Sequence, residues 1–123
     1  MFILLAAGCG ASYDPATGLA PTRILDLRDG FDFSVTVEKN EVLALDLRMP
    51  ARSGHSLVGA SFDPAVLRLD RYLERDGGNA RYLFTAMENG LTDVLIKMEP
   101  EGGGDAEVYK RVSVTVGKRS TLF

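Results

Sequence analysis

The sequence has little of the residue types that build metal centres, disulfides and aromatic anchors. Its 123 residues include one cysteine, Cys9, one histidine, His55, and no tryptophan. A single cysteine forms no internal disulfide, and a zinc site needs a cluster of cysteines and histidines. The carboxylates also lack the regular spacing of a calcium-binding loop. We therefore expect no metal and no cofactor.

A strong charge of either sign is also missing. The net charge is −3, and the basic residues are scattered among acidic ones rather than gathered in a patch. Nucleic acid is therefore not an expected partner, because binding to phosphates requires a basic surface. The length of 123 residues and the hydrophobic content of 46% are typical of one globular domain.

No apolar run is long enough to cross a membrane. The longest N-terminal run, residues 2–8 (FILLAAG), is far shorter than the roughly 20 residues that a spanning helix needs. Its end, Ala6-Ala7-Gly8-Cys9, resembles a bacterial lipobox, in which the cysteine thiol takes a lipid. This resemblance implies a cell-envelope or periplasmic protein that meets the membrane only through a lipid anchor on Cys9. The alternative is an apolar segment in which Cys9 is simply buried.

Composition divides the chain into four parts. Residues 1–9 form the partial lipobox, and residues 10–22 are small, proline- and glycine-containing residues without periodicity, typical of a flexible tether. Residues 23–117 are predicted to fold as one domain. Residues 118–123 are expected to form a disordered tail.

From Arg23 onward, apolar and polar residues alternate with the period of a strand that buries one face. The clearest case is Phe31 to Val37, where every second residue is apolar. The predicted strands cover residues 23–28, 31–37, 42–48, 57–62, 66–73, 81–87, 94–98 and 108–116. Seven or eight short strands at this spacing predict an all-β fold, an antiparallel immunoglobulin-like β-sandwich with Greek-key connections.

A helix over residues 65–73 is the alternative at one place, because Asp63-Pro64 is a suitable helix start. The spacing of Leu67 and Leu69 favours a strand with both leucines directed inward. We therefore retain the strand.

Three polar loops stand out between these strands. Pro50 ends the strand at 42–48, because proline has no N–H for a ladder, and Gly54 suits a turn with positive φ. The other two loops are residues 75–79 (RDGGN), expected to be flexible, and residues 99–105 (EPEGGGD). Each follows a strand running in the same direction in the predicted sandwich. We therefore expect the three loops to form one composite surface.

Catalytic arrangements find little support. Ser53 and His55 lie two residues apart, with Asp46 or Asp63 as a conceivable third member of a triad. A triad also needs an oriented base and an oxyanion hole, and neither is indicated here. We expect His55 to be a solvent-exposed residue of a polar turn.

The carboxylates Glu99 and Glu101 flank Pro100, which raises the alternative of a carboxylate pair for glycoside hydrolysis. Their neighbours are the three glycines 102–104, which indicate a solvated acidic loop instead. These glycines also lack the lysine and helix of a phosphate-binding loop. We predict that the protein is not an enzyme.

The stretch from Arg23 to Val116 resembles the chagasin-like inhibitors of papain-type cysteine peptidases. That family is immunoglobulin-like and presents three loops at one end, with the motifs Asn-Pro-Thr-Thr-Gly, Gly-x-Gly-Gly and Arg-Pro-Trp. The present chain keeps Pro50 and Gly54 of the first motif and two glycines of the second. It keeps only Pro100 of the third. The strand phrases FDFSVTV, VLALDL and VLRLDRYL are also similar.

The resemblance implies an inhibitor whose three loops enter the active-site cleft of a papain-type cysteine peptidase. The residues placed on this surface are Pro50, Ala51, Arg52, Ser53, Gly54, His55, Asp76, Gly77, Gly78, Glu99, Pro100 and Glu101. The chain departs from the family in having no tryptophan and in carrying Glu99 where the family has arginine. The alternative is therefore a non-inhibitory cell-envelope lipoprotein that acts as a protein-interaction or structural module. An enzyme or small-ligand binder is less favoured, since a core of Leu, Val and Phe leaves little room for a pocket.

Overall fold

The computed structural model describes residues 20–50 and 54–118. Predictions about Cys9, residues 10–19 of the tether, Ala51 to Ser53 and residues 119–123 of the tail lie outside these residues. The end of the predicted tether is docked on the domain, because Pro21 is buried and the amide of Thr22 donates to the carbonyl of Val42 at 2.7 Å. The described part contains eight strands and no helix, so it has no helix able to span a membrane. The strands are β1 (Arg23–Asp26), β2 (Asp32–Val37), β3 (Val42–Arg48), β4 (His55–Ser61), β5 (Leu67–Arg75), β6 (Asn79–Ala86), β7 (Gly90–Pro100) and β8 (Glu107–Val116).

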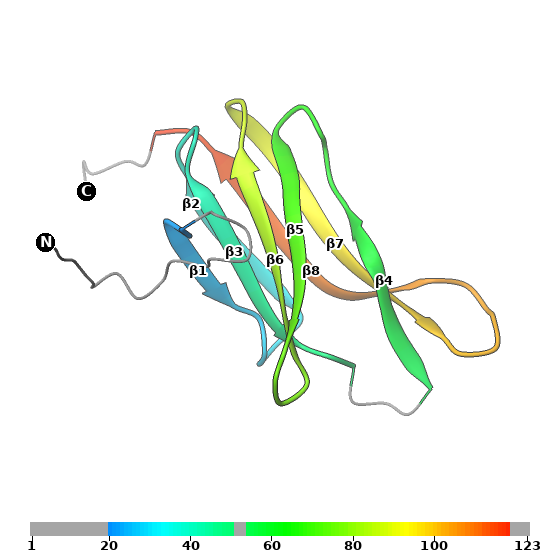
Figure 1. Cartoon of the computed structure of the whole chain (residues 1–123). Coiled ribbons are helices and arrows are strands. Elements are labelled where there is room, and N and C mark those ends of the chain that lie inside the picture. Colours follow the sequence, from blue (N-terminus) through cyan, green and yellow to red (C-terminus); the bar gives the residue numbers. More distant parts are fainter. Residues whose placement is uncertain (1–19, 51–53, 119–123) are drawn as a thin grey trace, which may run out of the picture.

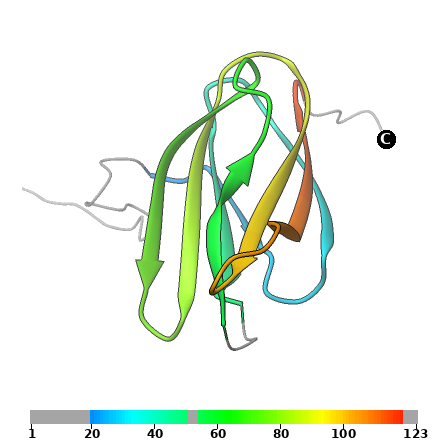
Figure 2. The ribbon, with the colours of Figure 1, turned by 90° about the vertical axis from the view of Figure 1, so that its right-hand side faces the viewer.

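The strands form two four-stranded sheets, in the orders β1-β3-β6-β5 and β2-β8-β7-β4 (Figures 1 and 2). This confirms the predicted all-β sandwich. Both sheets are mixed rather than purely antiparallel, because β1 pairs with β3 and β2 pairs with β8 in parallel. The chain leaves β1 in one sheet and enters β2 in the other. Strand periodicity carries no information about this crossing.

The core lies between the sheets and is built by the predicted alternation. Leu43, Leu45 and Leu47 of β3 are fully buried, as are Ile96 of β7 and Phe84 of β6. The ring of Phe84 meets that of Phe62 edge to face, with centroids 5.2 Å apart, which aromatic pairs prefer.

Strand β5 contains a β-bulge after Leu69. The segment is a strand, so the helical alternative is wrong, and its pairing with β6 shifts register between Leu69 and Arg71. Leu67 and Leu69 precede this shift and lie opposite Ala86 and Phe84, two core residues of β6, so both leucines occupy the inner face of the sheet as predicted. Leu67 is fully buried, whereas Leu69, on the same edge strand, is 37% exposed.

The outer face of the β1-β3-β6-β5 sheet is also partly closed to solvent. Ala44 and Leu83 lie opposite one another in the register of β3 and β6, and both are fully buried, although neither belongs to the core between the sheets. Beside them, Arg81 lies against Asp46 with only 10% of its side chain exposed. This outer face therefore carries a buried ion pair, which strand alternation alone would assign to a solvated surface.

Candidate functional site

Four connections lie at one end of the sandwich, the lower end in Figures 1 and 2. This follows from the strand directions: β1 and β3 are parallel and end there, whereas β6 is antiparallel to β3 and begins there. In the other sheet, β7 ends where β4 begins. The structure therefore brings together the two ends of the β3–β4 loop (residues 49–50 and 54), the β5–β6 loop (76–78) and the β7–β8 loop (101–106), together with the β1–β2 loop (27–31).

Main-chain hydrogen bonds join the β3–β4 loop to both of its neighbours. The amide of Met49 donates to the carbonyl of Gly78 at 2.7 Å, and the amide of Glu101 donates to the carbonyl of Gly54. The stems of the three loops are thus held at fixed positions relative to one another. Pro50, at the entry to the β3–β4 loop, is half-buried beside this connection.

The β5–β6 loop is a tight turn of residues 76–78. Gly77 and Gly78 have φ values of 78° and 77°, a region that residues with a Cβ enter at a cost. The side-chain amide of Asn79 donates to the carbonyl of Asp76 at 3.1 Å and closes the turn. The glycines therefore provide a compact hairpin tip, with Asp76 exposed upon it.

His55 lies in a strand and is half-buried, contrary to the prediction of a solvent-exposed residue in a polar turn. It is the first residue of β4, opposite Pro100 of β7, and its Nδ1 atom is buried without a hydrogen-bond partner in the described part of the chain. Strand β4 begins two residues earlier than expected, which draws His55 into the sheet. The conceivable triad acids are engaged elsewhere, Asp46 with Arg81 and Asp63 with the amide of Ala65.

Glu99 and Pro100 also belong to a strand, because β7 continues to Pro100. Glu99 is half-buried opposite Ser56, whereas Glu101 is exposed at the start of the β7–β8 loop. This loop extends away from the sheets in Figure 1, and Gly104 passes so close to Pro100 that an added Cβ would lie 3.0 Å from the proline ring. The two glutamates are therefore separated between sheet and loop rather than paired across a cleft.

Two residues of β8 form hydrogen bonds beneath the loops that were not predicted from the sequence. The hydroxyl of Tyr109 donates to the carbonyl of Arg48 at 2.9 Å, and the ammonium of Lys110 donates to the carbonyl of Gly30. Burial raises the pKa of Tyr109 and lowers the pKa of Lys110, in the latter case against the opposing effect of Asp29. For Lys110 the sequence did contain a signal, because this lysine interrupts an otherwise apolar series of alternate residues on β8.

Comparison with known proteins identifies similar folds. No protein-family model matches the chain, and no curated protein sequence matches it. The structure of the cysteine protease inhibitor EhICP2 from Entamoeba histolytica matches with a TM-score of 0.61 and 12% identity, covering 77% of this chain and 96% of that one. PbICP-C, solved in complex with falcipain-2, matches with a TM-score of 0.55 and 14% identity, covering 77% and 99%. Identities this low show a shared fold, and that fold agrees with the resemblance found in the sequence.

Proposed function

We propose that this protein inhibits papain-type cysteine peptidases by placing the loop-bearing end of its sandwich in the active-site cleft. The observation that carries the proposal is the row of three loops joined through main-chain hydrogen bonds at Met49 and Glu101. The shared fold with EhICP2 supports it. The role is one of binding, and the chain supplies no catalytic group to the reaction.

The arrangement suits an inhibitor whose loop stems are fixed before binding. A loop whose ends are already held has less conformational freedom to lose in the complex, and this lowers the cost of association. The β3–β4 loop lies between the other two, so it would enter the cleft while they contact its rims. Tyr109 holds the carbonyl of Arg48 at the stem of this central loop and fixes the direction from which the loop leaves the sheet.

The chemistry of the loops predicts moderate affinity. The chain has no tryptophan, and losing one aromatic anchor typically weakens an interface about thirtyfold. Exposed carboxylates at Asp76 and Glu101 give two of the three loops a negative charge. A complementary peptidase would carry basic residues around its cleft, which would accelerate association at low salt.

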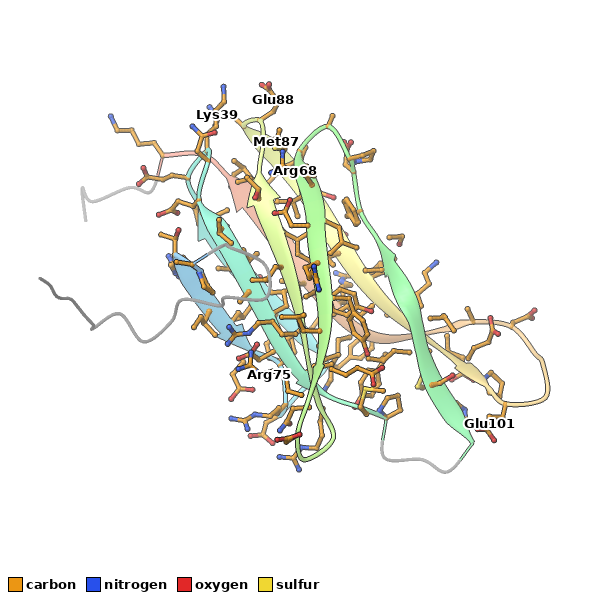
Figure 3. All side chains as sticks on the ribbon, in the orientation of Figure 1. Lys39, Arg68, Arg75, Met87, Glu88 and Glu101 are labelled. Carbon is orange, nitrogen blue, oxygen red and sulfur yellow. The ribbon has the colours of Figure 1, made fainter. Side chains whose placement is uncertain are left out.

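The experiment is a titration of the purified protein against papain and a cathepsin-L-like peptidase, following residual activity. We expect reversible inhibition that disappears when Ala51 to Ser53 are deleted. A matched control replaces Lys39 and Glu88 with alanine, since both lie at the opposite end of the sandwich (Figure 3). That control should inhibit like the natural chain. Absence of inhibition at tens of micromolar would reject the proposal.

A second candidate function is favoured by one feature, the glutamate at position 99. A carboxylate there replaces the arginine of the family's third loop, which suits a sandwich that binds a different partner in the cell envelope. Affinity capture with the natural chain distinguishes the two functions. Recovery of papain-type peptidases alone would reject this candidate, whereas recovery of a non-peptidase envelope protein that is lost on deleting Ala51 to Ser53 would favour it.

A further inference from the structure

Beside the loop end, the outer face of the β1-β3-β6-β5 sheet contains a hollow of about 580 Å³. One wall comes from the β1–β2 loop and the other from the β5–β6 hairpin, while the ends of β3 and β6 form the floor. The polar residues around it are Arg28, Asp46, Arg75, Asp76, Asn79 and Arg81. Because Asp76 also lies on the β5–β6 loop, the hollow is continuous with the proposed binding surface.

Two of the surrounding arginines are held in place by carboxylates. Arg81 binds Asp46 in a bidentate pair, with Nε–Oδ1 and Nη2–Oδ2 distances of 2.6 and 2.9 Å. Arg28 binds Asp26 in the same way at 2.9 and 2.8 Å. These pairs neutralise the floor and one wall of the hollow and fix the side chains there.

Two further arginines are not neutralised in this way. The register places Arg48 of β3, Asn79 of β6 and Arg75 of β5 in one row across the end of the sheet. Arg48 and Arg75 are both exposed, and neither forms an ion pair within residues 20–50 and 54–118. Strands lie about 4.8 Å apart, so the backbones of the two arginines are roughly 10 Å apart on the same face.

The local charge is opposite to that of the whole protein. The charged residues that line the hollow are three arginines, Arg28, Arg75 and Arg81, and two aspartates, Asp46 and Asp76. Their three positive and two negative charges give +1, in a chain whose net charge is −3. Arg48 lies next to this lining, opposite Asn79 in the register, and adds a second positive charge in the row of Arg75; an anion between these two arginines would relieve their mutual repulsion.

We propose that Arg48 and Arg75 form an arginine corner that receives the carboxylate of an acidic side chain from the bound partner. A guanidinium donates two parallel hydrogen bonds to a carboxylate, and the hollow provides room for the side chain that carries it. The partner is a protein rather than a free ion because the corner adjoins the loops, so a partner seated on them extends over it. This inference rests on the proposed inhibitory function.

The test compares two double variants of the whole chain that remove equal charge. Arg48→Gln with Arg75→Gln removes the corner, whereas Lys39→Gln with Arg71→Gln removes two exposed cations elsewhere. We expect the first to weaken inhibition roughly tenfold, as for the loss of charge-assisted hydrogen bonds, and the second to leave it unchanged. Equal inhibition constants for the two double variants would overturn the proposal and leave the inhibitory function intact. Thermal unfolding of each variant checks that it is folded.

A second readout does not depend on any peptidase. Titration of the ¹⁵N-labelled chain with succinate should shift the amide resonances of Arg48, Arg75 and Asn79, and the corner variant should lose these shifts. If the natural chain fails to inhibit but shows them, the corner stands and the inhibitory function fails. Two results would reject the corner. One is the absence of succinate-induced shifts at the corner in the natural chain together with normal inhibition by the corner variant. The other is the absence of both succinate binding and inhibition in the natural chain.

Discussion

Replacing Asp46 with alanine should lower the free energy of unfolding by about 2–3 kcal/mol. Asp46 forms a bidentate pair with Arg81, whose side chain is only 10% exposed. Removing one partner of a buried pair typically costs 3–5 kcal/mol, because the remaining charge stays buried without its counter-ion. The side chain of Asp46 is 30% exposed, so water can partly replace the lost carboxylate, and we reduce the expected cost accordingly.

The measurement is equilibrium unfolding in urea at neutral pH, followed through a double-mutant cycle. Replacing Asp46 with alanine and Arg81 with methionine together removes both charges and keeps an apolar side chain over the sheet. This double variant should be more stable than the Asp46 variant alone, because no buried charge is left uncompensated.

The sheet supplies its own control. Asp26 and Arg28 form a bidentate pair of the same geometry, but their side chains are 52% and 45% exposed. Exposed pairs are screened by solvent and contribute little, so Asp26→Ala should destabilise the protein much less than Asp46→Ala at neutral pH. Equal effects at the two positions, or a double variant whose cost is the sum of the single ones, would refute the reasoning that burial decides the energy.

Three further predictions concern the loop end. Tyr109→Phe removes the 2.9 Å hydrogen bond to the carbonyl of Arg48. It should lower the free energy of unfolding in urea by about 1 kcal/mol and accelerate amide hydrogen exchange near Arg48. Unchanged exchange there would count against a role for this hydrogen bond. Hydrogen bonds from Arg28 hold the pKa of Asp26 at about 2, below its ordinary value of 3.8. The ionised Asp26 therefore stabilises the folded protein above pH 3.8, and this stabilisation should be lost as the pH falls towards 2. The Asp26→Asn variant should lose less stability on acidification than the natural chain. Identical profiles of unfolding free energy against pH for the variant and the natural chain would contradict this prediction. Gly78→Ala should lower the free energy of unfolding by about 1–2 kcal/mol, because φ is 77° there; the added Cβ would meet no atom within 4 Å, so the cost comes from the backbone alone. The control is Gly117→Ala, which has equal space and no positive φ and should be neutral or slightly stabilising.

The alternation of apolar residues was sufficient to predict most strands. Leu43, Leu45 and Leu47 follow the period of a half-buried strand, and all three are buried in the core. Pro50 marked the end of its strand correctly, since β3 ends at Arg48. These features are local, because the preference of each residue depends on its immediate neighbours and on which face of its own strand it occupies.

The sequence by itself therefore determined the fold class and the segments that become loops. Tertiary structure alone decided how those segments meet, because pairing joins residues far apart in the chain. The parallel pairing of β1 with β3, the bulge after Leu69 in β5 and the entry of His55 into β4 all depend on such pairing. The same is true of Asp46 and Arg81, which lie 35 residues apart and meet only because β3 and β6 align. A one-residue change in the register of β3 against β6 would place these two side chains on opposite faces of the sheet, so no local pattern could have specified their contact.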